Sequence, residues 1–269
     1  MSRTHTRTHH WLALETSTDT LSLAVMRGDQ AWVHTSAGGA QASAQTLPQI
    51  QILMAHAGLR FAELDAVVFG RGPGAFTGLR TACSVAQGLA FGADVPVLPV
   101  DTLLAVAEEA RHAALHAALG LRAADAVSTP TPTRVLAVLD ARMDQVYVAA
   151  YEHTQGVWQC VQEAAVQNPE ALSWPTHWHA GEPFIAAGNA WGTYAVRWPA
   201  AFTAAQVQAL PTASALLRLA PVAWAQGLAV PAEQALPLYI RDKVAQTTQE
   251  RLQAKQQALA TDVPGRPVA

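Results

Sequence analysis

Charged residues, cysteines and long apolar runs are all scarce in this sequence, and each shortage argues against one class of protein. Charged residues make up 14% of the 269 residues and the formal net charge is −3, so no basic footprint indicates direct binding of nucleic acid. The two cysteines, Cys83 and Cys160, indicate no disulfide framework and fit a reducing compartment. No apolar run approaches the length of a membrane-spanning helix, about 18 residues. Residues 1–10 are polar and lack the apolar centre of a signal peptide, so we expect a cytoplasmic protein without a membrane partner.

Apolar residues make up 51% of the chain, which predicts a folded globular protein. The order of the predicted elements indicates the α/β class. Alternating apolar residues and tight turns predict an antiparallel meander of three strands, followed by helices that alternate with single strands. The predicted strands are residues 11–16, 21–26, 31–35, 66–69 and 95–100, and the predicted helices are residues 43–56, 77–92 and 102–118. Pro48 would suit the first turn of the first of these helices if that helix began near Leu47.

The second half of the chain predicts a second lobe. A Thr/Pro linker at residues 129–133 precedes a strand pair at 135–139 and 146–151, and 158–200 is expected to be an irregular α+β region with tryptophans in its core. A helix is predicted at 212–226. We therefore expect a first lobe at 1–107, with 212–241 packing back on it, a smaller lobe at 108–211, and a polar tail at 242–269.

A glycine-rich loop, Gly70 to Arg80, separates a predicted strand from a predicted helix. Such a loop can point free backbone N–H groups at a phosphate, or it can let helix and sheet pack closely, with Thr77 as the helix N-cap. Pro73 removes one N–H donor, no Gly-Lys-Ser/Thr follows, and no acid ends a strand at the spacing of a dinucleotide site. The sequence therefore favours neither a dinucleotide fold nor a Walker A loop.

A second loop, Glu15 to Asp19, lies between the first two predicted strands. An acid at a strand end, followed by a hydroxyl-rich turn, resembles the first phosphate loop of actin-like ATPases, although such turns also serve purely local hydrogen bonding. The two loops together supply a candidate nucleotide-binding set, which would be vestigial in a non-catalytic protein: Glu15, Thr16, Ser17, Gly72 and Gly74.

Two predicted helices carry small or apolar residues at helical spacing. Leu47, Ile50 and Met54 share one face of the first, and Ala82, Ala86 and Ala90 follow one line of the second, where small side chains would let a partner helix approach. Burial within the same domain explains the pattern equally well. His112 and His116 lie four residues apart on a later helix, but no glutamate adjoins His112 as a general base, so a solvated face is favoured over a metal site.

Several segments in this order resemble the TsaB (YeaZ) family. The most specific is Gly-Pro-Gly-Ala-Phe-Thr-Gly-Leu-Arg at 72–80, and the resemblance extends over about residues 11–241. The supporting segments are residues 14–18, 95–100, 139–147, 187–189 and 237–241.

The resemblance implies an actin-like ATPase fold of two ribonuclease-H-like lobes, each with a mixed β-sheet flanked by helices. It implies a role in making threonylcarbamoyladenosine in tRNA, beside the anticodon, as a non-catalytic partner of the transferase TsaD. TsaE joins the larger complex, tRNA is contacted only indirectly, and the isolated protein is a candidate homodimer. No cofactor is required, and ATP or ADP at the subunit junction is left open. The family's interface uses the first two helices, here with Leu47, Ile50, Met54, Thr77, Arg80, Ala82, Ala86 and Ala90.

One comparison within the resemblance separates this chain from its catalytic relative. That relative carries metal-binding histidines just after the strand that matches 95–100, whereas residues 101–106 here contain none, and His112 and His116 come too late. We therefore expect no metal and no catalysis. The alternative is a small-molecule kinase or ATPase on the same fold, which would need a second phosphate loop, a catalytic carboxylate and an adenosine pocket.

Overall fold

The computed structural model describes residues 8–39, 42–121, 132–179, 181–202 and 206–241. Two five-stranded sheets lie within the unit that ends at Leu238. The predicted polar tail at 242–269 and the linker up to residue 131 lie outside the described residues. Among the described helices, none combines the length and the apolar character needed to cross a membrane.

The first sheet has the strand order β3-β2-β1-β4-β5. The predicted meander is confirmed, since β1 (His10–Glu15), β2 (Thr20–Arg27) and β3 (Gln30–Ala37) pair antiparallel. The parallel strands β4 (Ala66–Gly72) and β5 (Val97–Asp101) extend the sheet from β1, so the carboxyl ends of β1, β4 and β5 meet at one edge. The two loops that the sequence singled out follow β1 and β4 at this edge.

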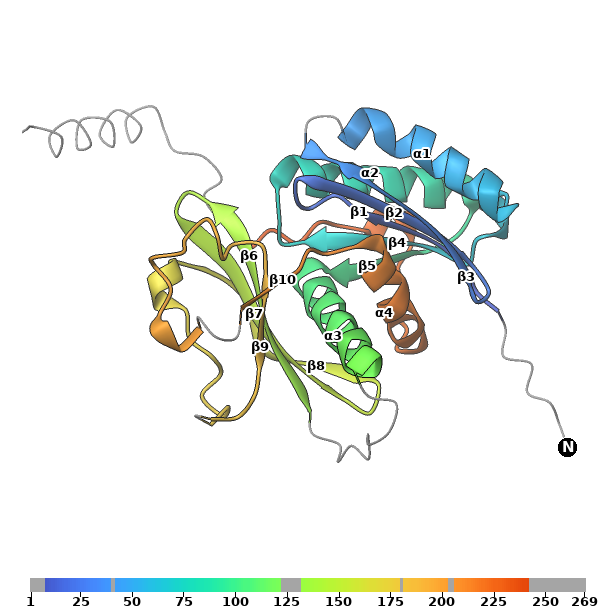
Figure 1. The fold of residues 1–269 in the computed structure, drawn as a ribbon. Coiled ribbons are helices and arrows are strands. Elements are labelled where there is room, and N and C mark those ends of the chain that lie inside the picture. The colour runs from blue at the N-terminus through green and yellow to red at the C-terminus, as the bar shows by residue number, and fades with distance from the viewer. Residues whose placement is uncertain (1–7, 40–41, 122–131, 180, 203–205, 242–269) are drawn as a thin grey trace, which may run out of the picture. The chain divides into compact units, whose positions relative to one another are not determined.

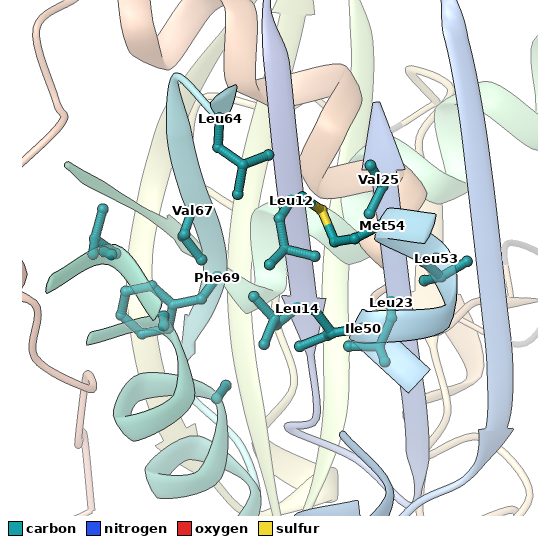
Figure 2. Packing of buried hydrophobic residues seen from close by; sticks show 14 of the residues in the cluster. Leu12, Leu14, Leu23, Val25, Ile50, Leu53, Met54, Leu64, Val67 and Phe69 are labelled. Carbon is teal, nitrogen blue, oxygen red and sulfur yellow. The ribbon is translucent and has the colours of Figure 1, made fainter. Parts of the chain in front are cut away.

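Helices cover both faces of the first sheet (Figure 1). α1 (Ala42–Ala57) and α2 (Phe76–Ala93) lie on one face, and α3 (Thr102–Leu121) and α4 (Ala213–Ala225) lie on the other. Alternate residues of the central strand explain this arrangement, because Leu12 and Leu14 point into the α1–α2 core while the intervening residues join the α4 core. Figure 2 shows the first of these cores, with Ile50 and Met54 of α1 against the strand leucines. A strand buried on both faces explains the continuous apolar run of β1.

Both helices start within one residue of the predicted ranges, but two details of these starts differ from expectation. α1 begins at Ala42 and not near Leu47, so Pro48 lies inside the helix, where the Thr46 hydroxyl donates to the Ala42 carbonyl at 2.6 Å. α2 begins at Phe76 with Ala75 as its N-cap residue and no side-chain cap, so Thr77 is not the N-cap.

The second sheet has the order β10-β9-β6-β7-β8. Its long strands β6 (Thr133–Arg142), β7 (Gln145–Thr154) and β8 (Val157–Gln167) pair antiparallel, and the short β9 (Ile185–Gly188) and β10 (Gln206–Gln208) are parallel additions. The expectation of an irregular region from 158 is wrong for β8. This edge strand is half exposed, and register shifts interrupt its pairing with β7, so its polar sequence carries no clear two-residue alternation.

α3 is the element shared by the two sheets, because it packs on β4 and β5 of the first and on β6, β7 and β9 of the second. The predicted boundary between residues 107 and 108 falls inside this helix, while α4 returns to contact β1, β2, β4 and β5. The second sheet has its own aromatic core, which confirms that the tryptophans of this region pack internally: Trp174, Trp178, Trp191 and Trp198.

Candidate functional site

The loop after β1 lies directly against the beginning of α2. Thr16 Oγ1 donates to the Gly78 carbonyl at 2.7 Å, and the Ala75 N–H donates to the Ser17 carbonyl at 2.7 Å. The predicted nucleotide-binding loops are therefore brought together at one sheet edge, but each uses polar groups of the other. A donor that a phosphate would need, the Ala75 N–H, is already engaged.

The glycines of the second loop are required by this close approach. A Cβ at Gly70 would overlap the Glu15 carboxylate, and a Cβ at Gly78 would overlap the Thr16 carbonyl. A Cβ at Gly74 would lie 2.6 Å from Ser17 Cβ, which no side chain tolerates without movement. These contacts confirm the packing interpretation of the glycine loop.

Gly72 has a different role, at the bulged end of β4. Its backbone has φ +120°, a conformation that favours glycine, and its N–H donates to Thr102 Oγ1 at 3.1 Å. A Cβ here would lie 2.6 Å from the carbonyl oxygen of Leu238, whose own N–H donates to the Arg71 carbonyl at 2.6 Å. The absence of a side chain at Gly72 thus leaves room for the segment that follows α4 to pack against the end of β4.

Glu15 is the electrostatically unusual residue of the site. Its side chain is 1% exposed, and one carboxylate oxygen, Oε1, accepts from the Ser17 N–H at 2.6 Å. Burial raises the pKa of this carboxyl above its usual value of 4.5, while the hydrogen bond from the Ser17 backbone N–H acts in the opposite direction. Glu15 Oε2 and Ser17 Oγ are buried with no hydrogen-bond partner among the described residues. These two oxygens are the unsatisfied buried polar atoms of the paired loops.

Among the described residues, no three His, Cys, Asp or Glu side chains gather with the geometry of a metal centre, at the paired loops or elsewhere. His112 and His116 contact each other on the exposed side of α3, with their Nε2 atoms 3.2 Å apart.

The interface residues predicted from the sequence divide into two groups. Leu47, Thr77 and Arg80 are exposed. The other five are buried in the core between α1, α2 and the sheet, and the expectation that they contact a partner is wrong for this structure: Ile50, Met54, Ala82, Ala86 and Ala90. Small side chains on α2 let the helix approach its own sheet, which is the burial alternative that the pattern left open.

The exposed side of α2 presents a different set of residues at helical spacing. Thr77, Arg80, Ser84, Gly88 and Phe91 follow one another every three or four positions. Phe91 is 82% exposed, and a Cβ at Gly88 would meet no atom within 4 Å.

α1 lies beside α2 on the same face of the sheet and adds exposed Leu47 (45%) and Ile52 (46%) (Figure 1). We call the solvent-facing residues of these two helices the α1–α2 face: Leu47, Ile52, Phe76, Thr77, Arg80, Ser84, Gly88 and Phe91. Sequence reasoning missed Ile52, Phe76 and Phe91. Gly88 is the signal that could have identified this side of α2. It is a glycine inside a helix, and no neighbouring atom of this chain lies close enough to require a glycine there.

The second-lobe segments of the resemblance also converge. The Asp140 N–H donates to Asn189 Oδ1 at 2.9 Å, and the Tyr194 hydroxyl donates to Asp140 Oδ1 at 2.8 Å. From the same β6–β7 turn, Arg142 Nη2 lies 2.8 Å from Asp19 Oδ2 in the β1–β2 turn. The turn therefore connects the second lobe to the first phosphate-type loop.

Two mixed sheets with shared and flanking helices, and paired loops at the carboxyl ends of the strands, define the actin-like, ribonuclease-H-like class of two-lobed α/β proteins. A family model described as "TsaD: tRNA N6-adenosine threonylcarbamoyltransferase" matches residues 28–264. The "tRNA threonylcarbamoyladenosine biosynthesis protein TsaB" of Escherichia coli is 32% identical over 241 residues, which cover 87% of this chain and 95% of the relative. The Haemophilus influenzae protein of the same name is 33% identical over 242 residues, 87% of this chain and 94% of the relative.

A comparison with solved structures indicates the same family. "YeaZ from Pseudomonas aeruginosa" is 38% identical with a TM-score of 0.74, and the match covers 86% of this chain and 99% of that one. The chain belongs to the TsaB (YeaZ) family.

Proposed function

We propose that this protein takes part in threonylcarbamoyladenosine modification of tRNA as a non-catalytic partner of the transferase TsaD. The names of the E. coli and H. influenzae relatives support the modification pathway. TsaE joins the larger complex, tRNA is contacted through the partners, and the protein acts in the cytoplasm. In the absence of TsaD, the same surface supports a homodimer.

The observation that carries the partner role is the α1–α2 face. Apolar side chains as exposed as Phe91 (82%) and Ile52 (46%) lose contact with water when a partner covers them, at about 25 cal/mol for each Å² buried. On α2 itself, Ser84 and Gly88 are exposed and small enough for a helix of the partner to approach closely. The face therefore supports helix-to-helix docking.

The non-catalytic part of the proposal is supported by the paired loops. Close packing of Gly74 and Gly78 on the β1 loop uses the space and the Ala75 donor that a phosphate would need. This role requires no cofactor. Should ATP or ADP bind at the junction with TsaD, contact with Glu15 Oε2 and Ser17 Oγ, which have no hydrogen-bond partner among the described residues, would require the loops to open, because both atoms are buried.

The test mixes purified full-length protein with TsaD of the same organism and follows size-exclusion chromatography with light scattering. We expect co-elution with TsaD, and no ATP hydrolysis by the protein alone. Threonylcarbamoyladenosine formation should require the protein when it is reconstituted with TsaD, TsaE and TsaC, which supplies the adenylate. Robust ATP turnover without association would contradict the proposal and favour the kinase or ATPase alternative.

A further inference from the structure

A cavity on the opposite side of the first sheet from the α1–α2 face has no role in the proposed function. It has a volume of about 750 Å³, within the range of small-molecule sites. α3, α4, the end of β5, the β7–β8 turn and the segment after α4 form its walls. Apolar side chains make up most of the lining, notably Leu104, Trp158, Val222, Ala223, Leu228 and Val230.

A buried ion cluster holds one end of the cavity in place. Glu108, 3% exposed, accepts from Arg111 and Arg218 at 2.9 Å and from Trp158 Nε1 at 3.0 Å. Arg218 also donates to Glu109 at 2.6 Å. These bonds join α3, α4 and β8, so the wall is organised before any ligand arrives. Preorganisation of this kind lowers the entropy cost of binding.

At the Glu108 end of the cavity, the hydrogen-bonding capacity left in the lining is that of donors. Glu108 already accepts four bonds, and Asp101 accepts from Arg71 at the other end of the cavity. Arg111 and Arg218 each use two of their five N–H groups in bonds to the glutamates of α3. A ligand that matches this wall brings acceptors, and a carboxylate forms the strongest bonds with guanidinium groups.

We propose that the cavity binds a small amphiphilic carboxylate. Its apolar body packs on α4 and Trp158, and its carboxylate accepts from Arg111 and Arg218. The α1–α2 face contributes no residue to this site, and the paired loops contribute only Arg71, whose guanidinium is bonded to Asp101, so the site is separate from the partner-docking face.

The test uses the full-length protein and isothermal titration calorimetry with dodecanoate below its micelle concentration. Dodecan-1-ol and dodecylammonium serve as neutral and cationic analogues. We expect saturable one-to-one binding of dodecanoate, and binding at least tenfold weaker for both analogues, since a hydrogen bond to a charged group is worth roughly a tenfold to hundredfold change in affinity.

Variants locate the bound molecule. Ala223→Trp fills the cavity and should weaken dodecanoate binding at least tenfold, whereas Ala225→Trp, on the exposed side of the same helix, should leave it unchanged. Should Ala223→Trp melt at a lower temperature than the unmodified protein, Leu228→Trp replaces it, since Leu228 is half exposed and also lines the cavity. Absence of saturable binding, equal affinity for the three probes, or binding unaffected by the cavity-filling variant would each overturn the proposal.

Discussion

Arginine placed at two nearby positions of α2 tests how this helix is oriented. Ala86 is 0% exposed and lies in the core between α2 and the first sheet, whereas Gly88 faces solvent and a Cβ there would meet no atom within 4 Å. The sequence alone leaves Ala86 open between a partner interface and burial, so the two variants test which of these alternatives holds.

The two substitutions should change the free energy of unfolding in opposite directions. At Ala86, arginine buries a charge at a cost of several kcal/mol and overpacks the core by about 1–3 kcal/mol more. Together these approach the whole stability of a domain, about 5–15 kcal/mol. At Gly88, replacement of a helical glycine by arginine should add about 0.5–1 kcal/mol of helix propensity.

The assay is urea unfolding followed by circular dichroism. Gly88→Arg should unfold at the wild-type midpoint or above it, and Ala86→Arg should be largely unfolded without denaturant. Wild-type stability of Ala86→Arg would refute the burial of this side of α2 against the first sheet.

Further predictions concern the buried acids. Gly70→Ala should lower the free energy of unfolding by about 2 kcal/mol, because its Cβ overlaps the Glu15 carboxylate, and Glu15→Ala in the same chain should recover part of the loss; a double-mutant cycle without coupling would contradict this. Burial raises the pKa of Glu15, so the contribution of this residue to the free energy of unfolding is fully present below pH 4.5 and is lost as pH rises through the folded-state pKa. Over that pH rise, Glu15→Gln should therefore gain stability relative to wild type in urea unfolding. Glu108→Ala should cost about 3–5 kcal/mol in urea unfolding, because Arg111 and Arg218 lose their buried counter-charge.

The first lobe could be predicted from the sequence because its elements carry strong local signals. Alternating apolar residues and tight turns located β1 to β3, and glycine and proline residues indicated where the helices begin and end. β8 could not be predicted, because an edge strand with one half-exposed side shows no clear period. Its existence depends on pairing with β7, which the local sequence does not encode.

The candidate site was only partly predictable for a related reason. The contact between the Glu15–Ser17 loop and the Gly70–Gly78 loop joins Thr16 to Gly78, 62 positions apart, and only the fold shows that the glycines admit carbonyl and carboxylate groups. On α2, small residues occupy both sides of the helix. Periodicity could identify two faces but could not decide which one the sheet covers, and Ala82, Ala86 and Ala90 proved to be the covered line.

The central claim is that the α1–α2 face binds TsaD, and isothermal titration calorimetry of TsaD with three proteins tests it most directly. The account predicts saturable binding of the wild type, at least tenfold weaker binding of Gly88→Arg, and wild-type affinity of Ala114→Arg, a matched change on the exposed side of α3. Equal affinity of Gly88→Arg and wild type, with both proteins folded, would contradict the account.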